Sequence, residues 1–171
     1  MKANLLALAA CALLLPSVPA QSLPSTCGPY RPKVRVKTTK RNHPPLQAAP
    51  GKATLVFVNN EDGCPRCGPV SVGLDGAWAG ANSGDSYFAV TVAAGDRYVC
   101  AYGNMGYLRY GMSDEPRYMV RLTELNAKPG AVYYFETASD PGAIFLREIA
   151  PDEGKFLVSQ SSLAIWPAQK R

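Results

Sequence analysis

Two cysteines separated by two residues, Cys64 and Cys67, form the one arrangement in this sequence that is typical of thiol chemistry. In thiol–disulfide enzymes a helix N-terminus lowers the pKa of the first cysteine of such a pair. Here a glycine, a proline and a strand-like segment follow, so no helix is expected. A zinc site needs four ligands, and the other candidates, Cys27, Cys100 and His43, are scattered. We therefore expect a structural disulfide and no metal, with thiol–disulfide exchange as the alternative function.

The start of the chain has the pattern of an export signal. Lys2 precedes an apolar run, Asn4–Leu15, which is too short to span a bilayer, and a small-residue cleavage site follows, ending at Ala20. We expect residues 1–20 to be a signal peptide and the mature protein to lie in the periplasm or at the cell surface. Acylation of Cys11, as in bacterial lipoproteins, is the alternative. In the mature chain no stretch approaches the length of a transmembrane segment.

Export places the remaining cysteines in an oxidising compartment, where they tend to pair. Three pairings are possible. The favoured one joins Cys64 to Cys67 and Cys27 to Cys100, so that one bond closes a turn and the other ties the N-terminal segment to a strand. The second choice joins Cys27 to Cys64 and Cys67 to Cys100. The long bond of the favoured pairing would stabilise the fold by about 4 kcal/mol through loop entropy.

Charge is unevenly distributed along the chain. Residues 21–60 carry seven Lys or Arg and no acid, whereas residues 61–171 carry ten Lys or Arg and thirteen Asp or Glu, a net charge of −3. The mature protein is therefore a basic arm on a mildly acidic body. Such an arm suits the phosphates of lipopolysaccharide or anionic lipid. Nucleic acid is excluded as a partner because the chain is expected to be exported.

Within the arm, basic residues alternate with proline and valine from Arg31 to Thr38, which predicts a strand with one charged face at a sheet edge. The candidate binding residues here are Arg31, Lys33, Arg35 and Lys37. The same charges would also protect an exposed edge from pairing with another chain.

A second candidate binding region is rich in tyrosine. Five of the nine tyrosines fall between residues 98 and 118, together with two arginines. Aromatic rings stack on sugars, and arginine binds anions, so we select Tyr102, Tyr107, Arg109 and Tyr110 as candidate ligand residues. Strand propensity alone also accounts for tyrosine in this region.

The sequence lacks the templates of enzymes. The single histidine, His43, precedes two prolines and is expected in a loop. Neither a nucleophile elbow nor a phosphate-binding glycine loop occurs. The carboxylate pairs Asp114-Glu115 and Asp152-Glu153 are adjacent in sequence and would not face each other as an acid–base dyad. We expect a non-catalytic protein without a cofactor.

Short strands separated by turn residues predict an all-β fold. We expect residues 21–51 to form a basic arm and Pro-rich loop, residues 52–166 one antiparallel β-sandwich, immunoglobulin-like or transthyretin-like, and residues 167–171 a tail. Seven to eight strands and at most one short helix, opening near Pro151, are expected. The candidate segments for these strands are Thr54–Val58, Val70–Leu74, Ala77–Gly80, Tyr87–Val92, Arg97–Tyr102, Tyr118–Leu125, Val132–Thr137, Ile144–Ile149 and, less regularly, Leu163–Trp166.

The segment from Lys52 to Tyr134 resembles the family called "domain of unknown function 2846", found in Gram-negative bacteria. The residues that carry this resemblance are Thr54–Val58, Val72-Gly73-Leu74-Asp75-Gly76 with Gly80, Tyr87-Phe88, Gly95 before Arg97–Ala101, and Pro129-Gly130 before Tyr133-Tyr134. The resemblance implies an exported, β-rich envelope protein and supplies no catalytic residues. The expected function is therefore a binding or structural module that contacts anionic lipid, lipopolysaccharide, a glycan or another envelope protein.

Overall fold

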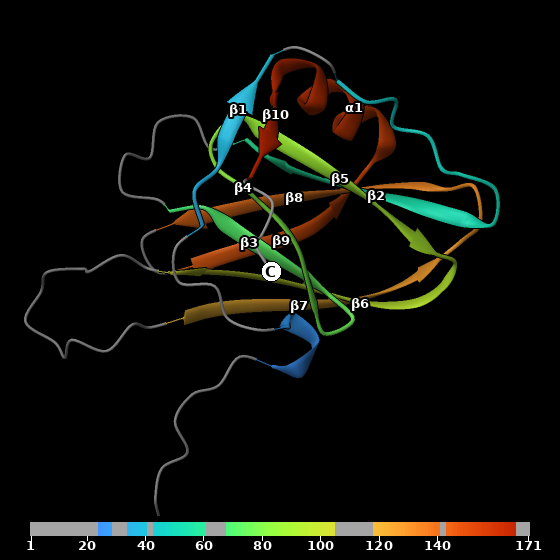
Figure 1. Ribbon diagram of the computed structural model, residues 1–171, viewed down its shortest axis with the longest axis horizontal. Coiled ribbons are helices and arrows are strands. Elements are labelled where there is room, and N and C mark those ends of the chain that lie inside the picture. The colour runs from blue at the N-terminus through green and yellow to red at the C-terminus, as the bar shows by residue number, and fades with distance from the viewer. Residues whose placement is uncertain are drawn as a thin grey trace, which may run out of the picture.

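A computed structural model of the chain describes residues 24–28, 34–40, 43–60, 68–104, 118–140 and 143–166. Ten strands in these residues form two sheets (Figure 1). The order in the six-stranded sheet is β1-β10-β5-β2-β8-β9, and the order in the four-stranded sheet is β4-β3-β6-β7. Among the described residues, no helix has the length and apolar character needed to cross a membrane.

The bounds of the elements are as follows. The six-stranded sheet contains β1 (Lys37–Thr39), β2 (Lys52–Asn59), β5 (Ser86–Ala93), β8 (Val132–Asp140), β9 (Ala143–Ile149) and β10 (Ser162–Ile165). The four-stranded sheet contains β3 (Val70–Leu74), β4 (Ala77–Asn82), β6 (Gly95–Asn104) and β7 (Tyr118–Ala127). The helices are the 3₁₀ turn η1 (Ser25–Cys27) and α1 (Pro151–Gln160).

The all-β class is confirmed, but two details of the prediction are wrong. The strand count is ten instead of roughly seven to eight, and each of the ten overlaps a segment that the sequence indicates as a candidate strand. The sheets are also not purely antiparallel, since β2 pairs with β8 and β10 pairs with β5 in parallel. These parallel pairs form because the chain crosses between the sheets before β8 and passes through α1 before β10.

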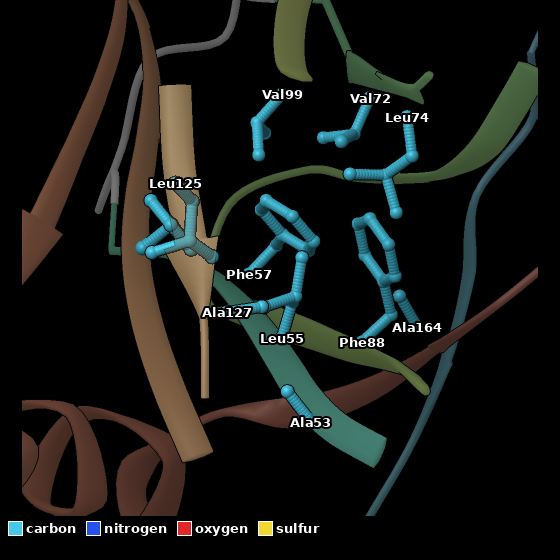
Figure 2. Close-up of a cluster of buried hydrophobic side chains, with 11 residues drawn as sticks. Ala53, Leu55, Phe57, Val72, Leu74, Phe88, Val99, Leu125, Ala127 and Ala164 are labelled. Carbon is cyan, nitrogen blue, oxygen red and sulfur yellow. The ribbon is translucent and has the colours of Figure 1, made fainter. Parts of the chain in front are cut away.

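The main core lies between the two sheets. Figure 2 shows Leu55 and Phe57 of β2 pointing toward Val72 and Val99 of the other sheet. The ring of Phe57 stacks on Phe88, with ring centroids 5.1 Å apart, and on Phe135, with centroids 5.3 Å apart. All residues of β2 after the first are buried, since its other face lies beneath α1 and the loop before β2. A strand covered on both faces is typically apolar throughout.

The turn between β3 and β4 is the Asp-Gly hairpin turn that the sequence predicts. Asp75 and Gly76 have φ angles of 49° and 84°, as a type I′ turn requires. Burial by itself would raise the pKa of the Asp75 carboxyl. Hydrogen bonds from Tyr98 N and the Arg97 guanidinium, each 2.8 Å long, together with the Arg97 charge, outweigh burial and lower this pKa.

Candidate ligand-binding site

The N-terminal segment is attached to the four-stranded sheet by a disulfide between Cys27 and Cys100, the long bond of the favoured pairing. Both cysteines are fully buried. η1 lies directly on β3, because a Cβ on Gly73 would be 2.7 Å from the Cys27 Cα. Glycine at position 73 therefore permits the close approach that the disulfide needs. Cys64 and Cys67 lie outside the described residues.

The predicted tyrosine region contributes to the core where it is described. Tyr102 is 1% exposed and packs with the disulfide, Trp78 and Val120. Its side chain is therefore part of a hydrophobic cluster and does not face a ligand at the surface. Tyr107, Arg109 and Tyr110 lie outside the described residues.

The described part of the basic arm reaches the edge of the six-stranded sheet. β1 pairs antiparallel with β10, and Lys37 lies opposite Ile165. Val36 packs against the core, so its neighbours Arg35 and Lys37, both exposed, face away from it. The edge position agrees with the prediction, but the strand covers only Lys37–Thr39, and residues 34–36, expected within it, have no regular secondary structure. Arg31 and Lys33 lie outside the described residues.

A groove of about 380 Å³ lies on the outer face of the same sheet, between residues 43–47 and α1. Figure 1 shows α1 over this sheet, near β5 and β10. The residues that line the groove are His43, Pro44, Pro45, Leu46, Gln47, Tyr87, Tyr134, Lys155, Val158 and Ser159.

Two tyrosines from neighbouring strand pairs form the sheet side of the groove. Tyr87 pairs with Val58, and Tyr134 pairs with Val56, so β2 separates the two tyrosines. They are 0% and 3% exposed, and burial raises the pKa of each phenol above its ordinary value of 10.0. The His43 ring lies over Tyr87, with ring centroids 5.5 Å apart.

The loop of residues 43–47 forms one wall of the groove, and hydrogen bonds to β2 hold it in place. The Thr54 hydroxyl donates a 3.1 Å hydrogen bond to the Gln47 carbonyl. Lys52 N donates to the Ala49 carbonyl over 3.0 Å and closes the turn that leads into the strand. Leu46 packs on the cluster beneath α1. The position of the loop wall therefore depends on the sheet.

Helix α1 forms the other wall of the groove and lies in close contact with the sheet. α1 begins with a proline at its first turn, as the sequence predicts, and continues through Gly154. A Cβ on Gly154 would be 2.5 Å from both Cβ and Cδ1 of Tyr134, so only glycine allows this approach. Lys155 and Ser159 are one turn apart and line the groove on the same side.

The lining of the groove combines positive charge with apolar surface. Lys155 supplies a positive charge, and no Asp or Glu is among the described residues that line the groove. Prolines, a leucine and a valine provide apolar surface beside hydroxyl, amide and imidazole groups. An apolar surface with a few convergent polar groups is typical of small-ligand sites. In the described residues, no group of His, Cys, Asp and Glu could hold a metal ion.

The sequence does not reveal this site, because its residues come from four separate segments. His43 was expected only as a loop residue, and Tyr87 and Tyr134 only as residues of strands. The local signal was Gly154, an unfavourable residue within a helix, which marks the contact with Tyr134. Comparison with family models, curated proteins and solved structures finds no match to this chain, so the resemblance to "domain of unknown function 2846" stays a prediction.

Proposed function

We propose that the protein is an exported, non-catalytic binding module of the cell envelope, which holds an anionic or glycan component in the groove beneath α1. One observation carries this proposal: the groove joins apolar surface from the loop and helix to polar groups and the positive charge of Lys155, and its described lining residues include no carboxylate. An apolar surface with a few convergent polar groups is typical of a small-ligand site, and the lysine favours an anionic ligand.

The basic edge supports the same proposal. Arg35 and Lys37 are exposed at the edge of the sheet that carries the groove. Positive charges near a site attract anionic ligands over roughly 10 Å at moderate salt. The partners considered are lipopolysaccharide, anionic lipid, a glycan or another envelope protein. An immunoglobulin-like or transthyretin-like layout of the sandwich stays part of this proposal.

The experiment compares binding of the mature protein to purified lipopolysaccharide and to a neutral glucan at several salt concentrations. Lys155→Ala should weaken lipopolysaccharide binding about 5- to 10-fold, as expected for loss of one charge-assisted contact. Lys128→Ala removes the same charge from the turn after β7, outside the groove, and should change little. Affinity should fall as salt rises. Equal binding by all three proteins, or no binding at low salt, would contradict the proposal.

A second candidate function is periplasmic thiol–disulfide exchange by Cys64 and Cys67. The bond between Cys27 and Cys100 supports this candidate, because it leaves Cys64 and Cys67 as the two cysteines of the mature chain that can pair with each other. Thiol titration under mild reductant tests the idea. A pair that is reduced readily, with a reactive Cys64, would support exchange, whereas two bonds that resist mild reduction would exclude it.

A further inference from the structure

Building on the proposed function, we infer that the outer face of the six-stranded sheet docks on the surface of an anionic lipid bilayer. In this arrangement Phe156 enters the boundary between headgroups and acyl chains, and the basic side chains around it contact lipid phosphates. Anionic lipid is one of the partners considered for the proposed function, and this orientation turns the groove beneath α1 toward the membrane.

Among the described residues, Phe156 of α1 is the most exposed large apolar side chain, at 64%. Gly154 and Val158, two positions before and after it, are buried against the sheet. Residues two positions apart lie on nearly opposite sides of a helix, because one turn takes 3.6 residues. The Phe156 ring therefore points away from the sheet. An aromatic side chain on the solvent side of a helix can enter a lipid surface without a change of fold.

A second exposed apolar side chain lies on the same face, at the edge formed by β10 and β1. Leu163 of β10 packs in the cluster beneath α1, and Figure 1 shows β1 and β10 beside this helix. Ile165 is two residues further along β10, so it lies on the same face of the sheet as Leu163. Ile165 is 46% exposed and pairs with Lys37, which is exposed like the neighbouring Arg35. Basic side chains therefore flank apolar surface on the face that carries α1.

Positive charge also predominates on α1 once its ion pair is considered. Lys155 directly precedes Phe156 and is exposed. Of the two acids in the first turn of the helix, Glu153 lies 3.4 Å from the Arg147 guanidinium, so its charge is largely compensated. Asp152 is the other acid. Lys155 and the two basic residues of the edge outnumber it, and each basic side chain near anionic lipid adds to the attraction.

The outer face of the four-stranded sheet is also partly apolar, but acids lie beside its exposed side chains. Tyr98 is 46% exposed and Leu122 is 53% exposed. Glu124 lies opposite Tyr98, and Asp96 is two residues from Tyr98 on the same face of β6. Anionic lipid repels such acids. Charge therefore selects the face that carries α1 as the docking surface.

The test measures sedimentation of the mature protein with phosphatidylcholine vesicles that contain or lack phosphatidylglycerol. Binding should require phosphatidylglycerol and weaken as salt rises. Phe156→Ser should weaken binding about 10-fold, by loss of buried aromatic surface. Lys37→Gln should weaken it about 5-fold, by loss of one charge near the lipid. The matched controls, Leu122→Ser and Lys128→Gln, make the same kinds of change at β7 and the turn after it, and should alter little.

Entry of the side chain into the lipid is measured separately. Phe156→Trp should bind like the wild type, and its tryptophan emission should move to shorter wavelength on vesicles, since indole favours the membrane interface. Leu122→Trp is the control and should show no such shift. Phe156 and Leu122 are both exposed, so these variants are expected to fold.

The outcomes separate this inference from the proposed function. Equal binding to both kinds of vesicle, or unchanged emission of bound Phe156→Trp, would overturn the docking surface. No vesicle binding, with lipopolysaccharide binding that still depends on Lys155, would also overturn it and keep the proposed function. Vesicle binding that depends on Phe156 and Lys37, without an effect of Lys155 on lipopolysaccharide binding, would support the docking surface and contradict the groove.

Discussion

Removal of the disulfide between Cys27 and Cys100 should be the most destabilising change that the structure suggests at the N-terminal segment. The bond joins residues 73 apart in sequence. Closing a loop of that length restricts the unfolded chain and corresponds to about 4.4 kcal/mol at room temperature. Alanine at both positions is the suitable change, because serine would bury an unpaired hydroxyl where both sulfurs are fully buried.

Packing adds to this loss. The disulfide contacts Tyr102, Trp78 and Val120 in one hydrophobic cluster, and two alanines would leave a void there. We therefore expect Cys27→Ala/Cys100→Ala to lower the free energy of unfolding by about 4–6 kcal/mol. For a domain of this size, 1 kcal/mol corresponds to roughly 2–4 °C, so the melting temperature should fall by at least about 8 °C.

Urea unfolding followed by tryptophan fluorescence measures this change, with Trp78 as a probe beside the bond. Both proteins should carry Cys64→Ser/Cys67→Ser, so that no other thiol exchanges with the pair. The m-value should rise in the variant, because an unfolded chain without the cross-link exposes more surface. A loss below about 1 kcal/mol with an unchanged m-value would refute the reasoning, since it would mean that the bond does not restrict the unfolded chain.

Gly154→Ala should lower the free energy of unfolding by about 1–3 kcal/mol, since the clash with Tyr134 outweighs the roughly 1 kcal/mol that alanine gains in a helix; a raised melting temperature would contradict this. The lowered pKa of Asp75 gives wild type a stability advantage over Asp75→Asn above pH 3.8, which should shrink as the pH falls further. Urea unfolding of both proteins at neutral and acid pH measures this advantage, and an equal difference in unfolding free energy at the two pH values would argue against the Arg97 contact. In an alkaline absorbance titration, Tyr87 and Tyr134 should ionise above 10.0, and Tyr134→Phe should remove one such late group; ordinary titration of both would contradict their burial.

Local patterns were sufficient to predict most strands. Val70–Leu74 is the strand β3 with the predicted bounds, and Thr54–Val58 lies within β2. Alternation and β-branched residues act over a few neighbours, so they can be recognised without the rest of the chain. The parallel pairs β2–β8 and β10–β5 depend on segments far apart in sequence, and no local pattern specifies which strands become neighbours.

The site was harder to predict than the fold for a related reason. Tyr87 and Tyr134 occupy ordinary strand positions, and their role depends on what covers that sheet face. The cover consists of the loop at His43 and the helix at Lys155, which are more than one hundred residues apart. Hydrophobic periodicity shows that a strand face is buried, but it does not show whether a hydroxyl there faces packed side chains or a groove.

The basic arm is also part of the architecture instead of a separate appendage. Cys27 joins it to β6 in one sheet, Lys37–Thr39 pairs with β10 in the other, and residues 43–47 form a wall of the groove. A single N-terminal stretch therefore contacts both sheets and the candidate site. The disulfide should fix the start of this stretch, and the edge pairing should fix its middle. The edge pairing holds Lys37, with Arg35 beside it, at the edge of the sheet that carries the groove, where positive charge increases the local concentration of anions.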